Sequence, residues 1–196
     1  RAMQVENDMD RLEALGVNIG LEPAGVEASI REVGMGFLFA PALHGAMRHA
    51  IGPRREIGVR TVFNILGPLT NPARAQHQLV GVYDGSLTAV MATVLHNLGA
   101  KRAFVVHGSD GLDELTTTGT SAVLALEDGE VSTFDVDPVA LGLAPAIPDE
   151  LVGGEPARNA DVVRRVLAGE HGPHRDIVTL NAAAGGITIQ GPSGLR

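Results

Sequence analysis

Residues 77–108, HQLVGVYDGSLTAVMATVLHNLGAKRAFVVHG, alternate between strand-like and helix-like patterns and decide the fold class. The two apolar ends of this stretch, 77–85 and 102–108, predict strands. The residues between them predict a helix. A strand, helix, strand succession is typical of an α/β sheet that contains parallel pairs.

The helix predicted between these strands spans residues 86–100. Ser86 suits the N-cap and Gly99 the C-terminal stop. The apolar residues that are expected to face the sheet are Leu87, Val90, Met91, Val94 and Leu98.

The segments on the carboxyl side extend the same architecture. Residues 121–136 predict a hairpin that turns at Asp128-Gly129. Residues 157–168 predict a helix, and residues 176–186 predict a strand that runs into a glycine-rich turn. Together they predict an α/β fold with a central mixed, largely parallel sheet flanked by helices.

The amino-terminal third has a mostly helical pattern. Residues 5–15 predict a helix that stops at Gly16, and residues 23–31 predict a second short one. The apolar run that begins at Gly34 predicts a buried strand, and residues 42–50 predict a further helix. A shift in composition near residue 72 separates this helical portion from the sheet portion.

Composition excludes several classes of function. The chain has 196 residues, and 15 Lys and Arg against 23 Asp and Glu give a net charge of −8. The absence of Cys excludes disulfides, a cysteine nucleophile and thiolate metal sites. The acidic balance and the 3% aromatic content argue against nucleic-acid binding. No signal peptide or membrane span is recognisable in the sequence, so we expect a cytoplasmic protein.

The segment GVRTVFNILGPLTNPA, residues 58–73, is the most informative motif. Its apolar part predicts a buried strand that ends at Gly67-Pro68, where glycine and proline fix a bend and allow a close backbone approach. A Gly-Pro pair alone most often marks a structural turn. The whole run carries more information than the pair.

This segment resembles the hallmark motif of the anthranilate phosphoribosyltransferases, which belong to glycosyltransferase family 3. Other stretches resemble the same family in the same order, and the likeness covers nearly the whole chain. They are LEALGV at 12–17, GFLFAPALHGAM at 36–47, PRREIGVRT at 53–61, HGSDGLDELTTTGTS at 107–121 and LNAAAG at 180–185.

The resemblance implies a nucleoside phosphorylase and phosphoribosyltransferase-like fold with part of a small helical domain. It assigns residues 1–20 and 41–58 to that small domain or its border, and residues 21–40 and 59–196 to a large α/β domain. The implied activity transfers the phosphoribosyl group of phosphoribosyl pyrophosphate to the amine of anthranilate, in tryptophan biosynthesis. It also implies Mg²⁺ as cofactor and a homodimer as the family's usual assembly.

Asp113 and Glu114 are the predicted metal ligands. Two adjacent carboxylates in a glycine-rich loop after a buried strand offer the oxygen ligands that Mg²⁺ takes. The alternative is an ordinary solvated acidic loop, and the family resemblance favours the metal. Asp110 is a weaker candidate. The three threonines at 116–118 either hydrogen-bond within the loop or only begin a strand.

Arg54 is the predicted anchor of the anthranilate carboxylate, because a guanidinium binds a carboxylate through two parallel hydrogen bonds. Arg55 remains the alternative. By resemblance His44 lines the pocket, although a half-buried structural histidine is nearly as good an interpretation. Gly67 and Pro68 are expected to line the entry path of the aromatic acid.

One family motif does not occur in the sequence. The Gly-Thr-Gly-Gly-Asp loop that binds phosphoribosyl pyrophosphate is absent, and Met3–Asp10 replaces a serine-rich segment. We therefore expect the chain to be roughly the carboxyl-terminal two-thirds of a family member, with little or no catalysis by itself. The alternatives are a pyrimidine nucleoside phosphorylase-like enzyme, a nucleic-acid-binding relative of the same fold, and a degenerate remnant without a ligand.

Overall fold

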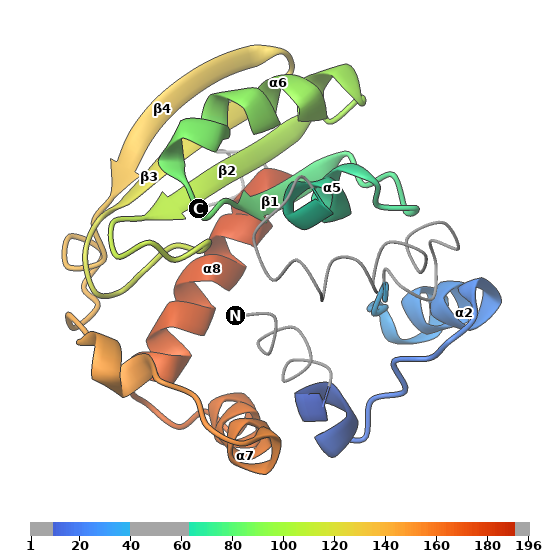
Figure 1. Cartoon of the computed structure of the whole chain (residues 1–196), viewed down its shortest axis with the longest axis vertical. Helices are drawn as coiled ribbons and strands as arrows, with labels where there is room; N and C mark the ends of the chain where they lie inside the picture. Colours follow the sequence, from blue (N-terminus) through green and yellow to red (C-terminus); the bar gives the residue numbers. More distant parts are fainter. Residues whose placement is uncertain (1–9, 40–62, 191–196) are drawn as a thin grey trace. The chain divides into compact units, whose positions relative to one another are not determined.

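The computed structural model describes residues 10–39 and 63–190 (Figure 1). It divides into two compact units. Unit 1 comprises Arg1–Pro72 and Gly153–Arg164, and unit 2 comprises Ala73–Val152 and Arg165–Arg196. The helix predicted at 42–50 lies outside the described residues. The assignment of the chain to a small and a large domain stays a prediction.

Unit 2 is built on a four-stranded sheet with its strands in chain order. These are β1 (His77–Gly81), β2 (Arg102–Gly108), β3 (Ser121–Glu127) and β4 (Glu130–Val136). Strands β1 and β2 are parallel, whereas β2–β3 and β3–β4 are antiparallel. The mixed sheet flanked by helices is confirmed. Among the described strands, however, only one of three pairs is parallel, so parallel pairing is less prevalent than predicted.

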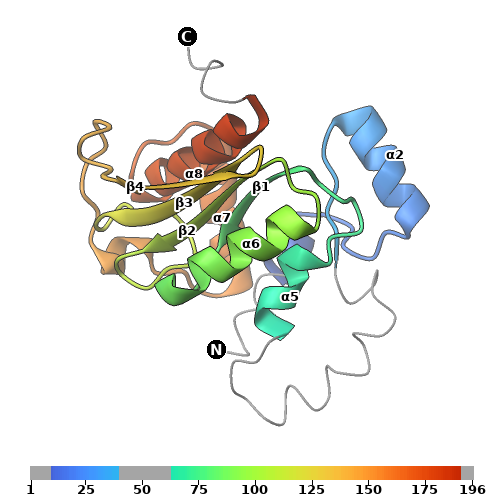
Figure 2. The same cartoon turned by 90° about the horizontal axis from the view of Figure 1, so that it is seen from above.

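The strand predicted at 176–186 is wrong, because these residues lie within the long helix α8 (Pro173–Gln190). Pro173 occupies the first turn, where its missing N–H costs nothing, and the run of alanines favours a helix. A short apolar run does not by itself distinguish a buried strand from a buried helix. Figure 2 shows α8 over one face of the sheet and α6 (Thr88–Asn97) over the opposite face.

The core beneath α8 fixes that helix on the sheet. Leu180 and Ala184 of α8 pack against apolar side chains from β2, from β3 and from the loop between these two strands. These partners are Val106, Leu115 and Val123. The cluster joins α8 to the loop that carries the predicted metal ligands.

Helix α6 confirms the predicted helix but differs in its cap and its buried face. A short 3-10 helix, η1 (Gly85–Leu87), precedes α6, and Asp84 rather than Ser86 caps it: Asp84 Oδ1 accepts the Ser86 N–H at 2.9 Å. The buried residues are Met91, Ala92 and Leu95. Val90 and Leu98, from the predicted stripe, are exposed. Ala92 is 1% exposed, and a prediction that selects only large apolar residues omits it.

The hairpin predicted at Asp128-Gly129 is confirmed. Glu127 pairs with Glu130 across a two-residue turn. Asp128 and Gly129 have φ angles of 47° and 92°. Positive φ at both central residues is typical of the type I′ turn, whose twist matches that of the two strands.

Unit 1 confirms the amino-terminal helices in part. Residues 10–14 are helical and end at Gly16 with φ 84°. Helix α2 (Pro23–Val33) starts with Pro23 in its first turn and ends at Gly34. The strand predicted after Gly34 is wrong, because residues 35–39 have no regular structure and are at most partly buried.

Helix α5 (Phe63–Leu69) corrects the strand predicted in the hallmark motif, and it contains Pro68. The apolar run in this motif is too short for its spacing to distinguish a strand from a helix. Helix α7 (Pro156–Leu167) confirms the helix predicted at 157–168, and η2 (Pro148–Leu151) is a short 3-10 turn. Within residues 10–39 and 63–190, no helix has the length and apolarity needed to cross a membrane.

Candidate functional site

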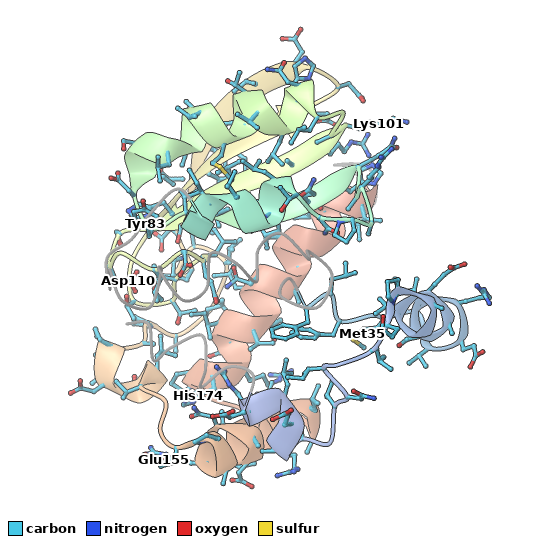
Figure 3. The ribbon with its side chains drawn as sticks, turned by 45° about the vertical axis from the view of Figure 1, so that its right-hand side comes forward. Met35, Tyr83, Lys101, Asp110, Glu155 and His174 are labelled. Atoms are coloured by element: carbon cyan, nitrogen blue, oxygen red, sulfur yellow. The ribbon has the colours of Figure 1, made fainter. Side chains whose placement is uncertain are left out.

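The loop between β2 and β3, residues 109–120, carries the predicted metal ligands and is called the acidic loop here. It leaves the carboxyl end of β2, and β1 ends at the same edge because the two strands are parallel. Figure 3 shows Asp110 and Tyr83, which follow these strands, toward one end of unit 2, with Lys101 at the opposite end. Loops at the carboxyl ends of parallel strands are the usual place for a ligand site in α/β proteins.

Asp113 and Glu114 have exposed side chains on this loop. Leu115, directly after them, is 2% exposed and belongs to the core. The chain therefore turns from solvent to core within one residue. This arrangement presents two carboxylates to solvent from a backbone that the core holds.

Asp110 stabilises the acidic loop by accepting hydrogen bonds from other residues of the same loop. Its Oδ2 accepts the hydroxyls of Thr116 and Thr118, each at 2.6 Å, and its Oδ1 accepts the Leu112 N–H at 3.1 Å. The Thr118 N–H also donates to Thr116 Oγ1 at 3.0 Å. The threonines thus hydrogen-bond within the loop, one of the two alternatives left open by the sequence. Strand β3 begins only at Ser121.

These hydrogen bonds control the charge of Asp110. Partial burial raises the pKa of this carboxyl group, but the bonds from Thr116, Thr118 and Leu112 lower it by more. The net pKa lies below the ordinary value for aspartate. Asp110 is therefore a structural carboxylate near neutral pH, with both oxygens already engaged by the loop.

Helix α8 holds the acidic loop through Asn181. The Leu115 N–H donates to Asn181 Oδ1 at 2.9 Å, and Asn181 Nδ2 donates to the Leu115 carbonyl at 2.8 Å. Strand β1 also lies against the loop, because a Cβ at Gly81 would overlap the carbonyl oxygen of Asp113. Only glycine leaves room for that approach.

Two buried threonine groups lie beside the acidic pair. Thr116 and Thr117 are 0% exposed, and the Thr116 N–H donates to the Ser121 hydroxyl at 2.9 Å. The Thr117 carbonyl accepts the Ala146 N–H at 3.0 Å. Thr117 Oγ1 is the one buried side-chain polar atom without a partner in the described part of the chain.

The turn after β1 completes this end of unit 2. His107 Nδ1 lies 2.8 Å from the Val82 carbonyl, which indicates that Nδ1 carries a proton. The backbone and hydroxyl of Ser86 donate to Asp84 and lower the pKa of that carboxyl group. The bond from His107 to the Val82 carbonyl connects the end of β2 to the turn that leads into α6.

The sequence-predicted site residues fall into three groups. Asp113 and Glu114 lie together on the acidic loop of unit 2. Gly67 and Pro68 lie in helix α5 of unit 1 and are partly buried. His44, Arg54 and the alternative Arg55 lie outside the described residues.

Sequence reasoning missed the part that Asn181 plays. The strand predicted at 176–186 includes the LNAAAG motif, whereas Asn181 and Leu180 lie on helix α8, and Asn181 bonds to the acidic loop. The available signal was the proline at 173 followed by a run rich in alanine, which favours a helix. A single amide within such an apolar helix usually has a specific hydrogen-bond partner.

The donor set of the acidic loop fits a hard divalent cation better than a transition metal. Among residues 10–39 and 63–190, no three His, Asp or Glu side chains gather to hold a metal by themselves. Two exposed carboxylates alone suit Mg²⁺, which keeps several waters and binds together with substrate phosphates.

Comparison with known proteins gives one consistent result. Residues 8–192 match the family model described as "Glycosyl transferase family, a/b domain". The anthranilate phosphoribosyltransferase of Trichlorobacter lovleyi is 58% identical over 173 residues, which cover 88% of this chain and 50% of that protein.

Solved structures agree with this. The crystal structure of the Thermus thermophilus anthranilate phosphoribosyltransferase is 47% identical with a TM-score of 0.82, covering 90% of this chain and 52% of the other. The Saccharomyces cerevisiae enzyme in complex with PRPP and Mg is 28% identical with a TM-score of 0.85, covering 94% and 54%.

The chain spans about half the length of the curated relatives it matches, 51% and 50% for two of them. This is less than the two-thirds expected from its motifs. The match of the family model nevertheless extends over both compact units and includes the acidic loop. The chain belongs to the glycosyl transferase family, whose α/β-domain model it matches over residues 8–192.

Proposed function

We propose that this chain is part of an anthranilate phosphoribosyltransferase and contributes the acidic loop to its active site. The observation that carries the proposal is 58% identity to a curated enzyme of that name over 173 residues. The acidic loop supports it, because Asp113 and Glu114 are exposed at the carboxyl edge of the sheet. The proposed role belongs to tryptophan biosynthesis in the cytoplasm, and a homodimeric assembly stays a prediction.

The proposed reaction exchanges one bond at C1′ of the ribose. The anthranilate amine forms a bond to C1′, the bond from C1′ to the pyrophosphate oxygen breaks, and pyrophosphate leaves with the electron pair. The amine then loses a proton to solvent. Charge develops chiefly on the leaving group, so the protein's task is to neutralise that charge and position the two substrates.

Asp113 and Glu114 are the groups that would hold Mg²⁺. When bound, this ion supplies charge neutralisation to the departing pyrophosphate. The relative solved with PRPP and Mg is consistent with such a site in this family. Asp110 contributes indirectly, since its hydrogen bonds to Thr116 and Thr118 fix the conformation of the loop.

Anthranilate would be bound by residues of unit 1. Arg54 is proposed to hold the substrate carboxylate, with Arg55 as the alternative, and His44, Gly67 and Pro68 to line the pocket. The Saccharomyces cerevisiae relative solved in complex with 4-fluoroanthranilate shows that such an analogue binds to a member of this family. A guanidinium pairs with a carboxylate in a fixed bidentate geometry, which would orient the amine toward C1′.

A chimera tests the proposal directly. This chain replaces the matching half of the Trichlorobacter lovleyi enzyme, and the loss of anthranilate fluorescence is followed with phosphoribosyl pyrophosphate and Mg²⁺. We expect turnover by the chimera. The combined substitution Asp113→Asn with Glu114→Gln should lower kcat/KM on the order of 100-fold or more, because the metal loses its ligands.

The intact Trichlorobacter lovleyi enzyme is the positive control. A folded chimera that leaves anthranilate unconsumed would contradict the proposal. Phosphorolysis of thymidine by the same chimera would instead support the nucleoside phosphorylase alternative. An unchanged Mg²⁺ dependence in the doubly substituted chimera would reject the metal assignment but leave the transferase activity standing.

A further inference from the structure

The amide of Asn181 pairs with both backbone groups of a single residue. Leu115 donates its N–H to Asn181 Oδ1 at 2.9 Å and accepts from Asn181 Nδ2 at 2.8 Å. Nδ2 also donates to the Ile177 carbonyl in the preceding turn of α8, at 3.0 Å. The Asn181 side chain therefore satisfies both the N–H and the carbonyl of Leu115, as a neighbouring strand would in a sheet, although Asn181 lies on a helix.

The side chain of Leu115 is held by the same helix. Leu115 is 2% exposed and shares a core cluster with Leu180, the residue next to Asn181. Backbone and side chain of Leu115 are thus both fixed to α8. Because Leu115 directly follows Glu114, a displacement of α8 would be transmitted to the acidic pair.

The ends of the two parallel strands also lie against the backbone of the acidic pair. A Cβ at Gly81 would overlap the Asp113 carbonyl oxygen, and a Cβ at Gly108 would lie 3.2 Å from the Glu114 carbonyl oxygen. The backbone of the pair is therefore packed against β1 and β2, while its carboxylates are exposed.

We propose that Asn181 is a positioning residue that sets the geometry of Asp113 and Glu114 and thereby the metal affinity of the acidic loop. The inference rests on the proposed function, because it takes these two carboxylates as the metal ligands. Groups that orient metal ligands typically account for a 10- to 100-fold effect on affinity. In this chain, Asn181 would act on the backbone next to the ligands, at Leu115, and not on the carboxylates themselves.

The test measures metal binding by the full 196-residue chain without any substrate. Mn²⁺ replaces Mg²⁺, since both take oxygen ligands and Mn²⁺ is paramagnetic. Its binding is followed by the broadening of the backbone amide NMR signals of residues 112–115. Wild type is compared with Asn181→Leu, which keeps the size of the side chain and removes its hydrogen bonds to Leu115.

Asn159 offers a matched control. In unit 1 its Oδ1 accepts the Gly154 N–H at 2.7 Å and its Nδ2 donates to the Gly154 carbonyl at 2.8 Å. Asn159→Leu removes the same pair of bonds at a place separate in sequence from the acidic loop. A purely structural role for Asn181 predicts that both substitutions lower stability and that neither changes Mn²⁺ affinity.

We expect Asn181→Leu to raise the apparent Kd for Mn²⁺ about 10-fold, and Asn159→Leu to leave it within about twofold of wild type. Equal affinities of wild type and Asn181→Leu would overturn the inference alone. Should Asn181→Leu lose the folded spectrum, Asn181→Ala takes its place with the same expectation and the same contradicting result.

Failure of the proposed function would look different. If Mn²⁺ leaves the signals of residues 112–115 unbroadened in the wild-type chain, Asp113 and Glu114 are not its ligands. That outcome overturns the metal assignment and the inference together, whereas equal binding by wild type and variant overturns only the role of Asn181.

Discussion

At the scale of single residues, the acidic loop carries three exposed acidic side chains, one of which also stabilises the loop. Asp110 accepts three hydrogen bonds and is held in its ionised form. Asp113 and Glu114 are exposed on the same loop. All three acidic residues lie within five positions of one loop, and Asp110 is the one whose carboxylate holds Thr116, Thr118 and Leu112 of that loop.

The depressed pKa of Asp110 predicts a pH-dependent contribution to stability. A carboxyl group with a lower pKa in the folded state stabilises the fold above its unfolded pKa, and this is lost as pH falls through the folded pKa. At pH 6, Asp110→Asn should lower the free energy of unfolding by about 1 kcal/mol, since its amide nitrogen cannot accept from the threonines. The difference should shrink below about pH 4.

Urea unfolding of wild type and variant between pH 3 and 7 measures this difference. Asp135→Asn, which removes an exposed carboxylate on β4, is the control and should change stability little at any pH. A difference between wild type and Asp110→Asn that stays constant across the range would show that the ionised form of Asp110 is not what stabilises the loop.

At the scale of elements, α8 does more than cover the sheet. Its apolar residues Leu180 and Ala184 form part of the core. Its polar residue Asn181 accepts the N–H of Leu115 in the acidic loop. The helix nevertheless contains Gly185 and Gly186 in its interior. Glycine lowers helix stability because it loses more backbone freedom on folding than other residues do.

Gly186→Ala should therefore stabilise the chain by about 0.5–1 kcal/mol. A Cβ at Gly186 would meet no atom within 4 Å. Gly99→Ala is the matched control, because its Cβ also meets nothing within 4 Å but its φ is +91°. That substitution should destabilise by a similar amount or more. Thermal unfolding of both variants measures the effect, and a loss of stability in Gly186→Ala would contradict it.

At the scale of the whole molecule, the chain has two compact units and about half the length of its curated relatives. The residues predicted to bind the metal belong to unit 2, and those predicted to bind the aromatic acid belong to unit 1. The phosphate-binding Gly-Thr-Gly-Gly-Asp loop expected from the resemblance does not occur in the 196 residues.

The isolated chain should for this reason catalyse poorly. Compared at equal concentration with the chimera described above, we expect its rate of anthranilate consumption to be below about 1%, since backbone N–H groups of a glycine-rich loop supply much of the binding of a phosphate group. The same fluorescence measurement decides the matter. Turnover at ordinary enzymatic rates by the isolated chain would contradict the expectation.

Patterns that depend on near neighbours in the chain were predicted from the sequence. The Asp128-Gly129 hairpin and the helix stops at Gly16 and Gly99 require positive φ angles that glycine and aspartate tolerate, so local chemistry identified them. The acidic pair was identified by residue type and by the family motif around it. Its role as a metal site stays a prediction, as do the roles of Arg54 and His44.

The tertiary structure decided the conformation of two short apolar runs, of which only the run at 176–186 carried a helix signal in the sequence, and it alone decided what holds the acidic loop. Residues 176–186 and the hallmark motif both contain short apolar runs, whose conformation depends on the surface they pack against rather than on their own period. The bond between Asn181 and Leu115 joins residues 66 positions apart. No local pattern encodes such a contact, because it exists only once α8 has packed onto the sheet.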